Sequence, residues 1–197
     1  MPRATTVSPT RPAGDARERI LSTAYRLFCR HGIRAVGIDT IIAESGVAKM
    51  SIYRHFHSKD ELVLAVLQRR ESRWTQDWLQ TEVNRRAATG AERLLAIFDV
   101  FDEWVRRRDF EGCCFVRTLL EFADRKHPLH QASRQHLANV RAFLRSLAEE
   151  AGVGDPAALA HQWHILMKGS IVAAGEGDRD AARRAQAMGK LLLQHAR

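Results

Sequence analysis

From Asp15 almost to the last residue, apolar side chains recur at intervals of three and four, the spacing of one face of an α-helix. No segment shows the sustained alternation of apolar and polar residues that a half-buried strand requires. The pattern therefore predicts an all-α protein of about nine helices, without a sheet and without an internal repeat.

Capping signals divide this pattern into helices. Ser58 followed by Glu61 forms a capping box that opens a long helix running past Trp78, and Thr89 with Glu92 repeats the box. Asp155 followed by Pro156 is an N-cap with proline in the first turn. We expect the remaining helices to include Ile20–Phe28 (ended by Gly32) and to cover about 39–45, 49–56, from 113 to about 122, 127–151 and from 178 onward.

Residues 37–56, GIDTIIAESGVAKMSIYRHF, carry the most informative pattern. Gly46 permits the positive φ of a tight turn between two short helices. Ile41 packs the first helix inward with Ile42, Val47 fills the angle, and Ile52 and Phe56 anchor the second helix. Its opposite face then presents Met50, Ser51 and Arg54, with His55 at the edge. A short anchored helix with small and basic groups outward fits the DNA major groove.

The charge distribution agrees with a polyanionic partner. The chain has 31 Lys and Arg against 23 Asp and Glu, a formal net charge of +8. Residues 1–60 contribute +5 of this excess, and no acidic residue lies between Glu44 and Asp60, where Lys49, Arg54 and Lys59 are all basic. Charge alone identifies no partner, so it supports the turn pattern rather than replacing it.

Residues 15–62 resemble the DNA-binding region of the TetR family of transcriptional regulators. The matching segments are the first helix (DARERILSTAYRLFCRHG), Ala43–Val47, Ser51–Phe56 and Ser58–Leu62. The resemblance implies that Lys49, Met50, Ser51 and Arg54 meet base edges. It also implies that Tyr53, His55 and Lys59 contact phosphates and that Thr40 abuts the DNA backbone. Met50 departs from the Gly or Pro often found there, which favours an apolar base contact.

Each of these residues also has a plainer interpretation. Tyr53 can be a core aromatic whose hydroxyl reaches water. His55 and His57 can be solvated surface histidines, and their spacing of two on a helix makes a metal site improbable. Exposed basic residues commonly serve solubility alone.

The segment GCCFVRTLLEFADRKHPLH is similar to part of the same family and implies a ligand-binding and dimerisation domain. Aromatic stripes on three expected helices suggest an apolar pocket with a few polar groups near it. The candidate pocket residues are Trp74, Trp78, Phe98, Phe101, Trp104, Phe115, Arg117, Leu119, Phe122, His161 and His164, with Glu121 nearby. Such stripes are more often ordinary core.

The last two helices carry a 4-3-4-3 spacing typical of helix association. The expected homodimer interface consists of Leu159, Trp163, Leu166, Ser170 and Ala173 on one helix and Ala181, Ala185, Met188 and Leu192 on the other. Two such helices from each subunit would form a four-helix interface. The alternative is that both rows of residues, which we call the seam, pack inside one subunit.

Several classes of protein are disfavoured. The longest apolar run, Leu62–Leu67, is too short to cross a membrane, and the first residues lack a signal-peptide core. No nucleophile–base pair, metal spacing or phosphate loop stands out, so we expect no enzyme, catalytic residue, metal or cofactor. The unevenly spaced Cys29, Cys113 and Cys114 favour a reducing cytoplasm, and a redox role for the adjacent pair is the less favoured reading.

Together these features predict a disordered arm (residues 1–14), a helix-turn-helix domain (15–58) and a ligand-binding and dimerisation domain (59–197). The expected function is a repressor that binds a near-palindromic double-stranded DNA operator as a dimer and is released by an unknown small-molecule inducer. The alternative is an architectural DNA-binding protein without a ligand.

Overall fold

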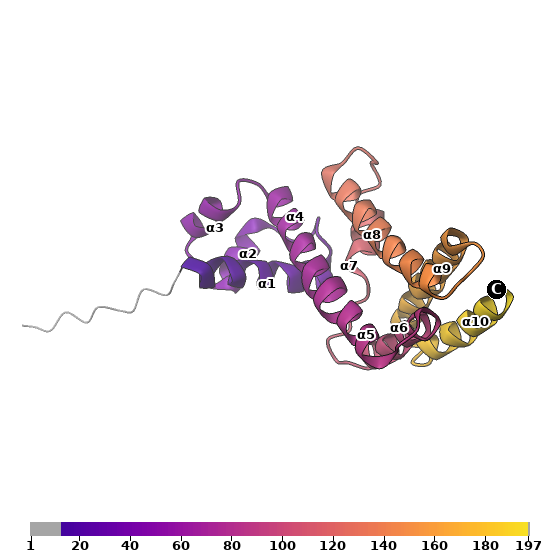
Figure 1. Ribbon diagram of the computed structural model, residues 1–197. Helices are drawn as coiled ribbons and strands as arrows, with labels where there is room; N and C mark the ends of the chain where they lie inside the picture. The colour runs from indigo at the N-terminus through magenta and orange to yellow at the C-terminus, as the bar shows by residue number, and fades with distance from the viewer. Residues whose placement is uncertain (1–12, 197) are drawn as a thin grey trace, which may run out of the picture. The chain divides into compact units, whose positions relative to one another are not determined.

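The computed structural model describes residues 13–196, and every regular element among them is helical (Figure 1). This confirms the predicted all-α class. α4 (Lys59–Arg70), a π-helical segment η1 (Glu71–Gln80) and α5 (Thr81–Arg86) follow one another without a break. Counted as one, this run gives nine helices among residues 13–196. The arm expected over residues 1–14 lies largely outside the described residues, and α1 begins at Ala13.

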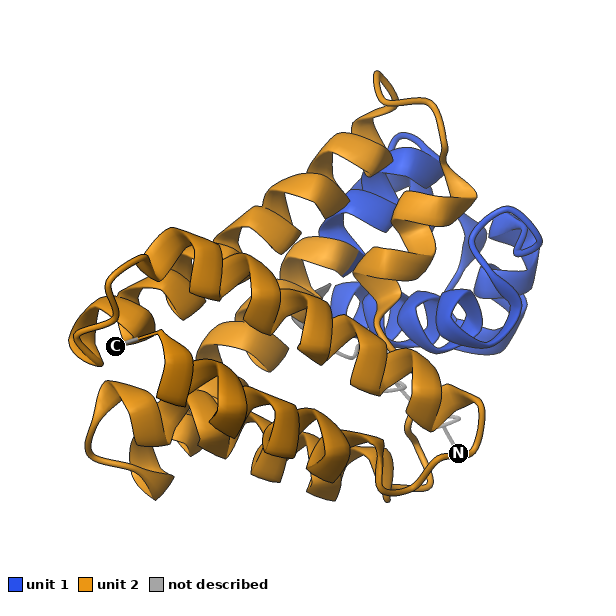
Figure 2. Ribbon diagram, turned by 90° about the vertical axis from the view of Figure 1, so that its right-hand side faces the viewer, with its two compact units in different colours: residues 1–66 blue, residues 67–197 orange. Residues whose placement is uncertain are grey.

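The chain divides into two compact units, which Figure 2 distinguishes by colour. The first unit extends to Val66 and contains α1 (Ala13–His31), α2 (Ile38–Ser45), α3 (Lys49–His55) and the beginning of α4. The division between the two units falls inside α4, after residue 66, and the first turns of that helix carry the buried side chains of Leu62 and Val63.

The core of the first unit is built by α1 together with the two short helices. The buried side chains of α1 are spaced as one helical face, and α1 packs against both α2 and α3. Gly32 ends α1 with a φ of 84°, as its position after the last buried residue predicts. The buried apolar members are Ile20, Leu21, Ala24, Leu27, Phe28, Cys29, Ile33, Val36, Ile41, Ile52, Phe56, Leu62, Val63 and Val66.

The second unit holds the larger core. It comprises η1, α5, α6 (Gly90–Val105), α7 (Cys114–Glu121), α8 (Pro128–Glu150), α9 (Pro156–Gly175) and α10 (Ala181–His195). α6 packs against α8, α9 and α10, while α9 lies between α8 and α10. The apolar face of α6, which includes Leu94, Ile97, Phe98 and Phe101, is therefore buried. Within residues 13–196, no helix combines the length and apolar character needed to span a bilayer.

The capping signals operate much as the sequence predicts. The Thr89 side chain accepts a hydrogen bond from the backbone N–H of Glu92, and the Glu92 carboxylate accepts one from the Thr89 backbone in return. At the start of α4, Ser58 Oγ accepts from the Glu61 N–H (3.1 Å). There the Glu61 carboxylate accepts from the N–H of His57, one residue before the N-cap (2.7 Å). Asp155 caps α9 through the N–H of Ala158 (2.9 Å).

Two helices differ from the expected pattern. The long fourth helix widens to π-helical geometry over Glu71–Gln80, which changes the faces that Trp74 and Trp78 occupy. The last helix begins at Ala181 instead of near 178, because a turn precedes it in which the Asp178 carboxylate accepts from the Asp180 N–H (3.0 Å).

Gly189 of α10 lies against the fully buried indole of Trp163, and this contact gives a testable prediction for the core. A Cβ at position 189 would stand 2.7 Å from Trp163 Cη2, whereas one at Gly169 of α9 would meet nothing within 4 Å. Because Trp163 has no room to move, Gly189→Ala should cost about 1–3 kcal/mol of unfolding free energy. Gly169→Ala, the matched control, should gain about 0.5–1 kcal/mol from its better helix propensity.

Urea unfolding followed by tryptophan fluorescence measures both changes, since all four tryptophans lie in the second unit. Equal midpoints for Gly189→Ala and the unsubstituted protein would show that the α9–α10 packing is looser than described.

Candidate nucleic-acid interface and ligand pocket

A tight turn joins α2 to α3 in the first unit. Gly46, the C-cap of α2, has φ 61° and ψ 30°, the left-handed conformation that a residue with a Cβ rarely adopts. Nη2 of Arg19 on α1 donates hydrogen bonds to the carbonyl oxygens of Ser45 (2.6 Å) and Gly46 (2.7 Å). The turn is thus fixed from both sides, by backbone conformation and by a charged donor that satisfies the last carbonyls of α2.

Two buried side chains hold α3 against the rest of the first unit, which we call the head. Ile52 is 1% exposed and Phe56 is 3% exposed, and the Arg17 guanidinium carbon lies 5.6 Å from the centre of the Phe56 ring. The half-buried Val47 lies between the two helices, and Ile41 is fully buried on α2. The inward face of α3 is therefore occupied by these apolar side chains, as the sequence pattern predicts.

The opposite face of α3 is open to solvent among the described residues. Met50 is 72% exposed, Lys49 and Arg54 are exposed, and Ser51 is half-buried. Nζ of Lys49 lies 3.8 Å from the Asp39 carboxylate, with both side chains largely exposed, so this pair is weak. The Glu44 carboxylate, the other acid of α2, is engaged by Arg26 of α1 (2.7 Å). The accessible face is consequently basic and apolar.

The residues expected at phosphates border this face. Tyr53 is 45% exposed, which places its ring mostly outside the core and disfavours the interpretation of Tyr53 as a core aromatic. Thr40 is exposed in the first turn of α2, and His55 is half-buried. Lys59 is half-buried, and its Nζ donates to the Arg34 carbonyl (3.4 Å), near the limit of a hydrogen bond. The eight candidate DNA contacts are thus all at least partly accessible to solvent.

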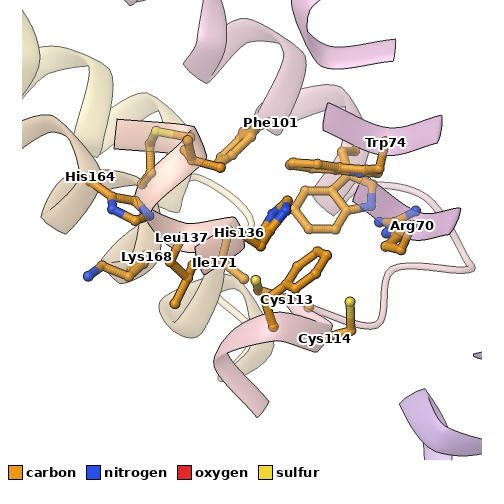
Figure 3. Close-up of a pocket in the computed structure, with 15 residues that line it drawn as sticks. Arg70, Trp74, Phe101, Cys113, Cys114, His136, Leu137, His164, Lys168 and Ile171 are labelled. Atoms are coloured by element: carbon orange, nitrogen blue, oxygen red, sulfur yellow. The ribbon is translucent and has the colours of Figure 1, made fainter. Parts of the chain in front are cut away.

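The second unit encloses an apolar cavity of about 40 Å³ (Figure 3). Its aromatic wall contains Trp74, Phe101, Trp104 and Phe115, whose rings come from η1, α6 and α7. His164 completes the expected residues that line it. The lining residues that the sequence pattern did not single out are Arg70, Gly112, Cys113, Cys114, His136, Leu137, Val140, Met167, Lys168 and Ile171.

Six expected pocket residues lie elsewhere. Phe98 is buried against Trp163 (ring centres 5.5 Å apart), and Phe122 ends α7 against His127 (4.6 Å). Trp78 does not line the cavity. Its ring centre lies 5.5 Å from that of Trp74, within the π-helical segment η1. On α7 the buried face contains Phe115 and Thr118, which leaves Leu119 beside it and Arg117 exposed. His161, one turn before His164, faces solvent.

Two polar atoms of cavity-lining residues, Nε1 of Trp74 and Nδ1 of His164, have no hydrogen-bond partner in the described part of the chain. Nδ1 of His136 lies 3.3 Å from the Glu71 carboxylate. Burial lowers the pKa of His136 to about 4 and that of His164 to about 3, so both rings are neutral at neutral pH. The His136 ring also stacks on Phe115, with an interplanar angle of 12°. Unpaired polar groups in an apolar cavity are suited to fixing the orientation of a small molecule.

The expected dimer seam is largely internal. Leu159, Trp163 and Ala185 belong to the core of the second unit, and Ser170 and Ala181 are buried as well. Leu166, Ala173 and Leu192 are half-buried, which leaves Met188 as the exposed member. The five buried residues therefore pack within the second unit, where α6, α9 and α10 contact one another.

Four large apolar side chains of these two helices are exposed, and Met188 of the expected seam is one of them. Ile165 and Val172 of α9 and Met188 and Leu191 of α10 are each more than half exposed. Their spacing of seven on α9 and three on α10 keeps each pair on one helix face.

Comparison with known proteins assigns both units. Residues 20–66 match the family described as bacterial regulatory proteins, tetR family. Residues 90–188 match the family described as tetracyclin repressor-like, C-terminal domain. The first match contains the turn and α3, and the second contains α6 to α9, most of α10 and most of the cavity wall.

Individual proteins give the same assignment over most of the chain. The HTH-type transcriptional regulator YjdC of Escherichia coli is 26% identical, covering 85% of this chain and 90% of YjdC. The HTH-type transcriptional repressor NemR of Escherichia coli is 26% identical over 68% of each chain. A solved structure from Streptomyces avermitilis, described as a TetR-type regulator, is 31% identical with a TM-score of 0.80, covering 92% of this chain and 97% of that one.

The fold agrees with this assignment in both units, and the geometry of the turn agrees with it in the first. The chain therefore belongs to the TetR family of DNA-binding transcriptional regulators, which are not enzymes.

Proposed function

We propose that the protein is a ligand-responsive repressor that binds a near-palindromic operator as a homodimer and is released by a small, largely apolar molecule. The observation that carries DNA recognition is the geometry of α3. Buried Ile52 and Phe56 fix its inner side, and the Gly46 turn fixes its approach, so the outer side is presented as a rigid surface.

The roles of the outer residues follow from their chemistry. Arg54 can bind the O6 and N7 atoms of guanine with two hydrogen bonds, and the exposed Met50 suits the methyl group of thymine. Lys49 and Ser51 complete the set at base edges. The groups bordering them, Thr40, Tyr53, His55 and Lys59, carry donors that suit phosphate oxygens and position the helix without reading sequence.

A homodimer accounts for a near-palindromic operator, because two-fold symmetry places two recognition helices over two half-sites. The exposed face of α9 and α10 formed by Ile165, Val172, Met188 and Leu191 is our proposed contact between subunits, in place of the buried seam. Apolar side chains that are more than half exposed on adjacent helices are typical of such interfaces.

Release by a ligand requires that the ligand bind one conformation of the dimer more tightly than the other. A coupling of about 1–3 kcal/mol changes DNA affinity by about 5–150-fold. α4 and η1 form one helical run that starts at the Ser58–Glu61 cap of the head and reaches Trp74 on the cavity wall. A molecule that displaces Trp74 thus acts on the same run of helix.

Repression is the sign we propose, in line with NemR, a repressor that shares this architecture along 68% of the chain. Three free cysteines among the described residues and a DNA partner are consistent with action in the cytoplasm.

Tyr53→Phe tests the phosphate contacts. Loss of a hydroxyl that donates to a charged phosphate should weaken binding about tenfold to every duplex, with unchanged preference among sequences. Tyr25→Phe, the matched control on α1, should bind as the unsubstituted protein does. Fluorescence anisotropy over a range of salt measures both, since log affinity falls linearly with log salt for phosphate contacts.

A sequence-specific loss in Tyr53→Phe would instead place this tyrosine at a base. A flat salt response of the unsubstituted protein would contradict DNA binding, and broad coating of DNA without a preferred site would favour the architectural alternative.

A further inference from the structure

The cavity of the second unit is asymmetric in charge. Its lining includes two cationic side chains, Arg70 and Lys168, and contains no aspartate or glutamate. Glu71, the acid that follows Arg70 at the start of η1, already has two polar neighbours. Its Oε1 accepts from Asn139 Nδ2 (2.7 Å) and lies 3.3 Å from His136 Nδ1. An apolar cavity whose lining side chains carry positive and no negative charge disfavours a cationic molecule and favours an anionic one.

The pKa values of titratable side chains on the cavity wall also reflect positive charge nearby. Burial raises the pKa of the Cys113 thiol, and the positive charges of Arg70 and Lys168 both act against that rise. Lys168 and Arg141 reinforce the burial that lowers the pKa of His164, and Arg70 does the same at His136. Positive charge from two sides therefore acts within the cavity, with Glu71 as the opposing charge at His136.

One end of the cavity pairs a cation with an unsatisfied donor. His164 and Lys168 are four apart on α9 and therefore share a helix face, and Figure 3 shows both at the end opposite Arg70 and Trp74. His164 is 3% exposed and its Nδ1 has no partner among the described residues. No carboxylate between residues 13 and 196 pairs with Lys168. A neutral imidazole that donates one N–H beside an ammonium group matches the two oxygens of a carboxylate.

The rest of the cavity accepts an apolar body. The rings of Trp74, Phe101, Trp104 and Phe115 line it, and the flexible side chain of Met167 lies at its wall. The cavity of about 40 Å³ is smaller than the roughly 150 Å³ of an apolar cavity that binds benzene, so a ring enters it only when the flexible Met167 side chain is displaced.

We propose that the inducer is a small aromatic carboxylic acid, bound as its carboxylate by Lys168 and His164 with its ring among the aromatic side chains of the cavity. This inference rests on the proposed ligand response and specifies the chemical class of the ligand. Lys168 supplies the charge and His164 the directed N–H donor.

The test compares acids with their uncharged and cationic counterparts. Phenylacetate, phenylacetamide and phenethylamine share one ring, and 2-naphthylacetate with its amide and amine gives a larger body. Calorimetry on the full chain should show the carboxylate binding at least about tenfold more tightly than the amide, as expected for a charge-assisted pair, with the amine weakest. The carboxylates should also release operator DNA.

Lys168→Met retains the length of the side chain and removes its charge. It should abolish the preference for acid over amide and leave amide affinity unchanged. Lys190→Met, an exposed lysine on α10, is the matched control and should preserve the preference. His164→Gln keeps an N–H donor and should retain most of the preference, whereas His164→Phe should lose part of it.

The outcomes separate the two proposals. Tighter binding of the amides or amines, together with release of DNA, would overturn the acid as the ligand class and leave the ligand response standing. Binding by none of the six compounds, at concentrations up to their solubility, would overturn the acid-binding pocket. DNA binding by the head would remain to be judged by its own measurements.

Discussion

Lowering the pH from about 7 to about 5 reduces the unfolding free energy of the second unit by about 4 kcal/mol, because two buried histidines resist protonation. Burial lowers the pKa of His136 from 6.5 to about 4 and that of His164 from 6.5 to about 3. Below pH 6.5 these two imidazole rings are therefore protonated in the unfolded chain but remain neutral in the folded protein. Stability falls as the pH falls, by about 2 kcal/mol for each histidine at pH 5.

The surrounding charges agree with this sign. Glu71 favours protonation of His136 and the positive charge of Arg70 opposes it, while burial, the largest effect, opposes it as well. Lys168, Arg141, His136 and His161 all oppose protonation of His164. Carboxylates with lowered pKa values, such as Asp102 beside Arg106, have unperturbed pKa values of 4.5 or below and contribute little at pH 5.

Urea unfolding at the two pH values, followed by tryptophan fluorescence, measures the effect on the second unit. The double variant His136→Gln/His164→Gln should lose most of the pH dependence, and His164→Gln alone should lose about half of it. Exposed His57→Gln serves as the control and should keep the full dependence. The readout is the difference between the two pH values, so packing lost with the His136–Phe115 stack cancels. Equal stability at both pH values would show that these rings are protonated without cost.

Arg54→Ala reduces discrimination between operator and random DNA by about 5–150-fold, the change expected when a bidentate contact to guanine worth about 1–3 kcal/mol is removed. Arg54 is exposed on α3, while Ile52 and Phe56 hold the helix, so truncation removes a contact without disturbing the core. Some affinity for all DNA is also lost with the charge.

Competition between labelled operator and random-sequence duplexes at one salt concentration gives the ratio directly. Arg30→Ala, which removes an exposed arginine from the last turn of α1, is the control for charge and should leave the ratio unchanged. Unchanged discrimination in Arg54→Ala would exclude base readout by this side chain.

The head follows from sequence because its determinants are local. Gly46, Ile52 and Phe56 lie within one short stretch, and their spacing defines both the turn and the buried face of α3. The contribution of Arg19 could not be read in this way, because it caps α2 from a helix 26 residues earlier in the chain.

The second unit was less predictable because its site is assembled from distant helices. Met167, Lys168 and Ile171 of α9 line one cavity with Trp74 of η1 and Phe115 of α7. In the sequence, the apolar residues among them follow the same helical spacing as residues of an ordinary core. The 4-3-4-3 spacing through Trp163 is the same whether these side chains pack within one subunit or between two. In the structure Trp163 belongs to the core that α6, α9 and α10 share. The π-helical turn that separates Trp74 from Trp78 leaves no signature in the pattern of apolar residues.

Selection of bound duplexes from a random pool is the most direct test of sequence-specific recognition by α3. We expect the full chain to enrich one near-palindromic sequence, with half-site centres about one helical turn or a multiple of it apart. We also expect Arg54→Ala to relax the enriched bases within each half-site. Failure of the unsubstituted protein to bind any duplex, or enrichment of no sequence at all, would contradict the recognition surface described for α3.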